Sequence, residues 1–370
     1  MGFADNQTIS TMMKTNHDLH YVGAKYLLDT DCVLLEDDRA VISWMAFMEA
    51  KGQYRYVFLR GLEFGMETLP ESVARTLEQH LVAHSALLRI THLILRYSEP
   101  FFESNPTLVG ALARTSTLKQ LEMTSAGPLS SEVIRSTQSK LSMANLSMVS
   151  RCFDGSHGLT SQKPEATGDR DPIRLLRNSA STLQALRIDT SSFCSRSRCF
   201  SGELDDVYPH LYRLELPDSV NGVTFSALLA HAYPNLRVLH LKTRRPRYWK
   251  CDEYRESNIR EQRTYAKWTE LEAFRGAVAD LYSLAPQCPV KSLILIHMQY
   301  HYAERQLSIV LQDAKPRFLS LCGMYDRQFT GVFVDTIRSP YAAQIECLEF
   351  MLHLALIPDV WCEENLVCVA

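Results

Sequence analysis

A six-residue pattern of apolar and polar positions recurs along most of this sequence. It reads apolar, two variable residues, leucine, one variable residue, apolar. The pattern occurs at residues 59–64, 90–95, 118–123, 143–148, 183–188, 211–216, 236–241, 290–295 and 345–350, and a weaker copy ends at residues 319–321. Alternation with a period of two is typical of a strand that has one buried face. The sequence therefore predicts a series of short, similar strands.

The spacing of these strands indicates a repeat protein. Seven of the nine intervals between successive starts fall between 25 and 31 residues. Leucine-rich repeats have a period of about 20–29 residues and pair a short strand with a returning helix. Apolar residues at helical spacing, such as Leu77 and Leu81, lie between the strands. The two longest intervals contain polar segments near 154–171 and 243–268, which we interpret as insertions that form exposed loops.

These patterns predict an α/β fold, namely a leucine-rich-repeat solenoid with a curved parallel sheet, outer helices and a short helical N-terminal cap. We assign residues 53–370 to an irregular solenoid of this kind. Typical leucine-rich repeats carry Asn or Cys shortly after the strand, and the corresponding positions here hold other residues. We therefore expect irregular turns.

Residues 1–52 do not show the repeat and form a separate helical segment in this interpretation. Residues 32–35 are apolar and are a candidate first strand. Asp37 and Asp38 follow, and either carboxylate is suited to cap a helix whose buried face would include Trp44 and Met48.

Composition and charge are those of an ordinary globular protein. Hydrophobic residues make up 46% of the chain and charged residues 22%, and the formal net charge is -3. Such a balance gives no global basic field that would attract nucleic acid or an anionic membrane. The longest apolar runs are far shorter than the roughly 20 residues that span a bilayer, so we expect no membrane segment.

The ten cysteines are scattered from Cys32 to Cys368 without regular spacing. A secreted disulfide scaffold would need a denser and more regular framework. The first residues also lack the basic and apolar regions of a secretory signal. We therefore expect reduced thiols in an intracellular protein of the cytoplasm or the nucleus.

Motifs for catalysis or metal binding are weak. The sequence contains no Gly-x-Ser-x-Gly, Walker or Gly-x-Gly-x-x-Gly motif. His80 and His84 are four residues apart, as are His297 and His301, but neither pair has the Glu of a zinc-protease helix. We expect no catalytic residue, no cofactor and no metal.

Charged residues cluster at the outward positions of several predicted strands. Neighbouring strands lie about 4.8 Å apart, so these side chains would stand side by side on the concave face, where solenoids usually bind their partners. The alternative is that opposite charges simply neutralise one another in solvent. The candidate residues for binding a protein partner are Glu122, Arg187, Asp189, Arg213, Glu215, His240 and Lys242.

A second candidate is the basic and aromatic loop within the 243–268 segment. Cations beside aromatic rings suit phosphate contacts and base stacking. A solvated loop is the favoured alternative, because Asp252, Glu253 and Glu256 follow directly, and contact with a peptide or acidic protein ranks ahead of RNA. Nucleic acid is therefore not the expected partner. The loop residues are Arg244, Arg245, Arg247, Tyr248, Trp249 and Lys250.

Residues 8–28, which end in the pair Leu27-Leu28 and precede the candidate first strand, resemble the second half of an F-box. Together with the repeats, this order is similar to fungal-type F-box/leucine-rich-repeat proteins. The resemblance implies that the N-terminal segment binds a Skp-type adaptor of an SCF ubiquitin ligase and that the repeats hold the protein to be ubiquitinated. The family's opening Leu-Pro-x-Glu helix has no counterpart, which indicates either a truncated gene product or a chain that has lost adaptor binding.

The sequence thus favours a non-enzymatic scaffold for protein interactions that resembles the substrate-recognition subunit of an SCF-type ligase. One alternative is a free-standing leucine-rich-repeat binding protein without ligase association, in contact with RNA through residues 243–250. Another alternative is a chain with no stable partner.

Overall fold

The computed structural model describes residues 6–15, 17–29, 32–50, 53–148, 172–189, 206–217, 226–242, 250–296, 301–324, 331–352 and 365–369. The chain divides into two compact units, Met1–Leu183 and Gln184–Ala370. The predicted insertion near 154–171 lies outside the described residues.

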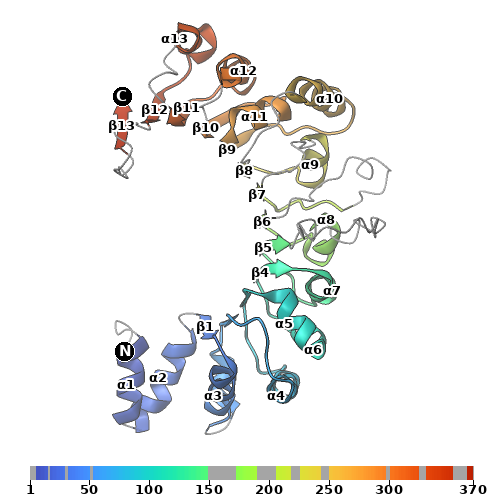
Figure 1. The fold of residues 1–370 in the computed structure, drawn as a ribbon, viewed down its shortest axis with the longest axis vertical. Helices are drawn as coiled ribbons and strands as arrows, with labels where there is room; N and C mark the ends of the chain where they lie inside the picture. Colours follow the sequence, from blue (N-terminus) through green and yellow to red (C-terminus); the bar gives the residue numbers. More distant parts are fainter. Residues whose placement is uncertain are drawn as a thin grey trace, which may run out of the picture. The chain divides into compact units, whose positions relative to one another are not determined.

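The described residues of the first unit form five strands that pair in chain order, and each pair is parallel. From α3 onward its helices lie along one side of these strands (Figure 1). The elements are α1 (Asn6–Thr15), α2 (His17–Asp29), β1 (Cys32–Leu35), α3 (Asp38–Glu49), η1 (Gln53–Val57), β2 (Gly61–Phe64), α4 (Glu71–Ala83), β3 (His92–Leu95), α5 (Ser98–Ser104), α6 (Thr107–Ala113), β4 (Gln120–Ala126), α7 (Pro128–Ser136), β5 (Met143–Met148), α8 (Pro172–Leu175) and η4 (Arg177–Ser179).

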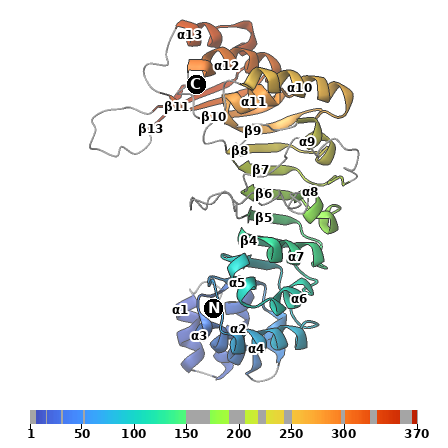
Figure 2. The ribbon, with the colours of Figure 1, turned by 45° about the vertical axis from the view of Figure 1, so that its right-hand side comes forward.

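The second unit repeats this arrangement. Strands β6 to β12 pair in chain order and in parallel, and β13 pairs antiparallel with β12. Figure 2 shows the strands side by side. The elements are β6 (Ala185–Asp189), β7 (Arg213–Pro217), α9 (Ser226–Ala232), β8 (Val238–Lys242), α10 (Cys251–Thr264), β9 (Leu271–Ala277), α11 (Val278–Leu284), β10 (Val290–Ile296), α12 (His301–Ala314), β11 (Phe318–Met324), α13 (Gly331–Ile337), η7 (Pro340–Ala342), β12 (Cys347–Leu352) and β13 (Asn365–Val369).

Each described repeat strand buries its leucines against the helices. In β3, Leu93 and Leu95 are each 1% exposed, whereas Ile94 between them is partly exposed. Ile94 and its equivalents point to the opposite face, which we call the open face because no described helix lies against it in the strands β2 to β12 (Figure 1). The prediction of an α/β fold with parallel strands and helices on one side is therefore confirmed.

The strand register corrects one copy of the six-residue pattern. We expected Met143 to begin the copy at 143–148, but Met143 is 39% exposed and pairs with Gln120 of β4. The buried positions are instead Leu141, Ala144 and Leu146. The copy therefore begins two residues earlier, and alanine occupies the place of its central leucine, which hid it from a pattern based on leucine.

Strand β9 was not predicted, because its apolar residues are unusual. Phe274 takes the place of the central leucine and Gly276 that of the last apolar residue. A Cβ atom on Gly276 would lie 2.8 Å from the ring of Phe274, so the phenylalanine ring fills the space that two aliphatic side chains share in other repeats. The long interval thus holds a complete additional repeat.

The prediction of an exposed loop is wrong for residues 251–264. They form α10, which packs beside α9 and α11. The buried amide of Asn258 accepts from the N–H of Ser226 at 3.1 Å and donates to the carbonyl of Ser283 at 2.8 Å. The side chain of Arg255 contacts the Asp313 carboxylate at 2.6 Å. These buried and partly buried polar contacts hold α10 in place despite its low hydrophobicity, which had suggested a loop.

The N-terminal helices follow the expected pattern. Asp37 caps α3 by accepting a hydrogen bond from the N–H of Ala40 at 2.7 Å, and the buried face of α3 includes Trp44 and Met48. Helices α1 and α2 pack together around a small core of Ile9, Met13 and Ala24. Gly23 is required in this contact, because a Cβ atom there would lie 2.4 Å from Met13.

Serine hydroxyl groups satisfy backbone groups where two of the strands begin. The Ser139 hydroxyl accepts from the N–H of Leu118 at 2.9 Å, and the Ser179 hydroxyl accepts from the N–H of Leu141 at 3.0 Å. Both serines are almost fully buried. Side-chain oxygens from the turn of the following repeat thus satisfy backbone donors at the entrances of β4 and β5.

Candidate functional site

Four strands of the second unit bring charged residues into one row on the open face. The strand register places Arg187 of β6 beside Glu215 of β7, Glu215 beside His240 of β8, and His240 beside Arg275 of β9. Arg213 and Lys242 flank this row, two residues before Glu215 and two after His240. We call these six residues the charged cluster.

Glu215 lies at the centre of the charged cluster, and its side chain is only 13% exposed. Arg213 makes the closest contact, with Nη2 2.6 Å from Oε1 of Glu215. Nδ1 of His240 lies 3.5 Å from the same oxygen. Lys242 and Arg187 approach the second oxygen, at 3.7 Å and 3.8 Å. One carboxylate is therefore shared among three permanent cations and one imidazole.

The electrostatics of the charged cluster leave positive charge in excess. Burial raises the pKa of Glu215, but the neighbouring cations, led by Arg213, outweigh this effect and hold that pKa below its ordinary value. Burial is the main cause that lowers the pKa of His240. Glu215 opposes it and the nearby cations add to it, and the pKa lies below its ordinary value. At neutral pH the carboxylate is therefore ionised and the imidazole is neutral, and four permanent cations face one carboxylate.

Six of the seven predicted partner-binding residues lie in the second unit, and the structure brings five of them together. Asp189 is exposed on β6 and forms no ion pair with the cluster residues. Glu122 belongs to the first unit, where β4 pairs with β3. The pKa of Arg96 is raised mainly by Glu63, and Glu122 adds a smaller contribution in the same direction. Glu122 thus lies near Arg96 and is not a member of the charged cluster.

Sequence analysis missed Arg275, because it missed the strand that carries it. A usable signal was present at the entrance of β9. Tyr208, Tyr233 and Trp268 each stand three residues before the first leucine of a repeat. All three are buried, and the indole N–H of Trp268 donates to the carbonyl of Tyr233 at 3.0 Å. An aromatic residue at this spacing marks the beginning of a repeat even where the strand lacks its central leucine.

Most of the predicted basic loop lies outside the described residues, including Arg244, Arg245, Arg247, Tyr248 and Trp249. Lys250 is described, is exposed and occupies the N-cap position of α10.

The two predicted histidine pairs have different outcomes. His80 of α4 and His84, which caps the end of that helix, lie in a buried aromatic cluster. The ring of His84 stacks on Tyr56 with centroids 4.2 Å apart. The Tyr56 hydroxyl lies 2.7 Å from Nε2 of His80, and Nδ1 of His80 lies 3.2 Å from the carboxylate of Glu49. These partners make both histidines part of the core. His297 and the side chain of His301 lie outside the described residues.

A thiol and an imidazole meet on the open face of the first unit. Sγ of Cys32 lies 3.4 Å from Nδ1 of His92, across Gly61. A Cβ atom on Gly61 would lie 2.5 Å from that sulfur. These residues line a cavity of about 520 Å³ together with Arg60 and Lys119. The contact was not predicted, because it depends on the register of three strands.

Two further findings concern the described residues as a whole. They contain no group of three or more His, Cys, Asp or Glu side chains arranged to hold a metal ion. They also contain no helix that is both long and apolar enough to cross a bilayer. The sequence matches no protein-family model, and no curated protein is significantly similar to it.

Proposed function

We propose that this chain is a non-enzymatic scaffold of the leucine-rich-repeat type, and that the charged cluster binds an anionic segment of a protein partner. The observation that carries the proposal is the excess of cations around Glu215 on a face without covering helices. Because hydrogen bonds to Glu215 already hold Arg213 in place, that side chain loses less entropy when a partner binds. Arginine is also the cation most often found in binding hot spots.

The repeated strand and helix units support the solenoid part of this proposal. In a solenoid, each unit contacts mainly its neighbours, and the face without helices presents one residue from every strand. That arrangement suits the recognition of an extended acidic segment, since the row of Arg187, Glu215, His240 and Arg275 runs across four strands.

The resemblance of residues 8–28 to part of an F-box extends the proposal to a ligase. In that case the helical pair α1 and α2 docks a Skp-type adaptor, and the second unit holds the protein to be ubiquitinated. Such a subunit acts by raising the effective concentration of its target near the transfer chemistry. It performs no bond-making step itself.

The test of partner binding compares the wild-type chain with the triple variant Arg213→Gln, Lys242→Gln and Arg275→Gln in affinity capture from cell extract with quantitative mass spectrometry. We expect a set of proteins with acidic segments to be lost by at least tenfold with the variant, and salt to weaken their capture. Equal capture by both chains would contradict the proposal.

A matched control removes the same charge elsewhere. Arg89, Arg114 and Lys267 are exposed, so their triple replacement by Gln changes the net charge equally and should leave capture unchanged. The same experiment tests association with a ligase. If neither Skp nor cullin is recovered, the ligase part of the proposal is excluded and the binding of a protein partner is not affected. Captured proteins that disappear after ribonuclease treatment would favour the RNA-binding alternative through residues 243–250.

A further inference from the structure

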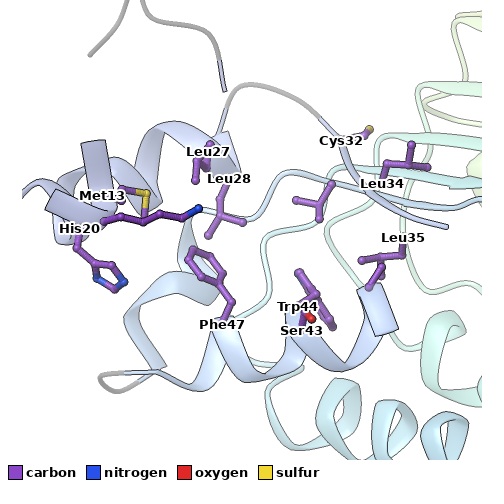
Figure 3. A pocket seen from close by; sticks show the side chains of 13 residues that line it. Met13, His20, Leu27, Leu28, Cys32, Leu34, Leu35, Ser43, Trp44 and Phe47 are labelled. Atoms are coloured by element: carbon purple, nitrogen blue, oxygen red, sulfur yellow. The ribbon is translucent and has the colours of Figure 1, made fainter. Parts of the chain in front are cut away.

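The outer edge of the first strand lies at the bottom of an apolar groove. All four residues of β1 line a pocket of about 650 Å³, within the range of about 300–1,000 Å³ typical of ligand sites. Figure 3 shows α1 and α2 on one side of this groove and α3 on the other. The α1 and α2 side contributes Met13, Lys14, His20, Leu27 and Leu28, and the α3 side contributes Ala40, Ser43, Trp44 and Phe47.

The hydrogen-bond pattern of β1 leaves backbone groups directed into this groove. The carbonyl of Leu35 accepts from the N–H of Gly65 at 2.8 Å, so Leu35 and Val33 turn their backbone groups toward β2. In a strand the backbone groups of alternate residues point in opposite directions. Leu34 therefore turns its N–H and C=O outward, and no described residue forms a hydrogen bond with either group.

The side chains around this edge are mostly apolar, which suits the apolar side chains of an added strand. Leu34 is an apolar side chain that is 43% exposed, and Trp44 and Phe47 form the wall opposite α2 (Figure 3). Main-chain hydrogen bonds to an exposed edge provide affinity in strand addition, and pockets for alternate side chains provide specificity. The groove supplies both.

We propose that β1 binds an extended peptide segment of another protein as an additional strand. Its apolar side chains, at every second position, fill the pocket between Leu28 and Phe47. An acidic residue at one end lies near Lys14, a cation of the lining. This proposal does not depend on the proposed function of the charged cluster.

The shape of the groove excludes a second copy of this chain as the occupant. In a second copy, β1 lies at the bottom of the same groove between α2 and α3, so two such strands cannot reach each other. A single extended segment has no such obstacle. About 5 residues suffice, since each residue of a strand spans about 3.3 Å.

The experiment selects binders from a phage-displayed library of random nine-residue peptides on the immobilised full-length chain. The recovered peptides should have apolar residues at alternate positions and an acidic residue near one end. A fluorescein-labelled peptide of the recovered sequence is then titrated with the chain, and the dissociation constant is measured by fluorescence anisotropy.

Two variants of Leu34 distinguish the contribution of backbone hydrogen bonds to peptide binding from that of apolar side-chain contacts. Leu34→Pro removes the outward N–H and should weaken peptide binding by at least tenfold. Leu34→Ala keeps that N–H and should weaken binding by no more than about threefold. Because the N–H of Leu34 does not bond to β2, proline is compatible with this position of an edge strand, and equal urea midpoints of the two variants verify folding.

N-methylation of the peptide provides a test on the wild-type chain. Methyl groups on alternate peptide nitrogens should abolish binding, and those on the intervening nitrogens should leave it unchanged. Bound peptide should also slow alkylation of Cys32 but not of Cys347, which is exposed on β12. Replacement of Arg213, Lys242 and Arg275 by Gln should have no effect on this peptide.

Three results would overturn the proposal. One is a library in which no recovered peptide responds to Leu34→Pro. Another is an N-methylation profile without alternation, which would show apolar binding without strand addition. The third is a dimer of the wild-type chain that Leu34→Pro dissociates, because the occupant would then be a second copy.

Discussion

Glu99 of the first unit and Glu215 of the second are both largely buried carboxylates, and they are satisfied in different ways. Glu99 accepts hydrogen bonds at 2.9 to 3.0 Å from the backbone N–H groups of Gly127, Leu129 and Ser130, and from the Ser130 hydroxyl, at the beginning of α7. Glu215 is surrounded by cationic side chains.

Glu99 therefore has a structural role, whereas Glu215 gathers cations on the open face. Neutral amide and hydroxyl donors bind the buried Glu99 carboxylate and place no cation at the surface. The cations around Glu215 exceed its charge and are about half exposed. Their excess charge can attract an anion from solution.

The largest effect is expected for Glu99→Ala. Removal of the carboxylate leaves buried donors without an acceptor, and we expect a loss of about 3 kcal/mol in the free energy of unfolding. Urea unfolding at two salt concentrations measures it, and the loss should not depend on salt. The control is Glu132→Ala on the exposed side of α7, which should change stability by less than about 0.5 kcal/mol.

A smaller effect is expected for Glu215→Gln. The cations lose their common partner but remain partly hydrated, so the expected loss is about 1 kcal/mol. Because the remaining cations repel one another, added salt should reduce this loss. Glu63→Gln is the matched control, since Arg96 is the one ion-pair partner of Glu63 among the described residues. A loss for Glu215→Gln that does not respond to salt would contradict the interpretation of the cluster as a surface with excess charge.

The third prediction concerns acid stability. Burial, then the neighbouring His84, lowers the pKa of His80 from 6.5 in the folded state. The unfolded chain therefore binds the proton more readily, and stability should fall as the pH drops below about 6.5. His80→Gln should reduce the slope of unfolding free energy against pH in this range. The pKa of His240 is also lowered, so His240→Gln should reduce this slope as well. The two effects should add, since the two residues lie in different units.

The smallest effect is expected in the affinity of the charged cluster for an anionic partner. As the pH falls from 7.5 to 5.5, protonation of His240 adds a cation beside Arg275, and binding should tighten by about twofold to fivefold. Titration of a captured partner at both pH values measures this change. The His240→Gln variant should have the same affinity at both pH values. If the affinity of this variant still changes with pH, His240 is not the source of the pH response.

The accuracy of sequence prediction depended on whether a repeat used ordinary residues. Strands with leucine at both inward positions, such as β3 with Leu93 and Leu95, were predicted correctly, and so was the cap of α3 at Asp37. Strand β9 was missed, because Phe274 fills the volume above Gly276. The copy at β5 was displaced by two residues, because alanine replaces its central leucine.

The candidate sites were predictable only in part. Arg187, Arg213, Glu215, His240 and Lys242 were predicted to be close, because regular parallel strands place equivalent positions side by side. Arg275 was not included, since its strand had been interpreted as part of a loop. The groove beside β1 was not predicted at all, because it is formed by three helices and a strand edge whose relative positions have no signature in the local pattern.

The sequence alone determined the class of fold, since a period of 25 to 31 residues with alternating leucines allows little other than parallel strands with returning helices. Tertiary structure decided which charges meet and which backbone groups remain unpaired. Glu215 becomes a shared partner of several cations only when three strands are in register, and Leu34 presents its N–H outward only because Val33 and Leu35 pair with β2. Periodicity is a local property of the chain, whereas register and edge exposure result from contacts between distant segments.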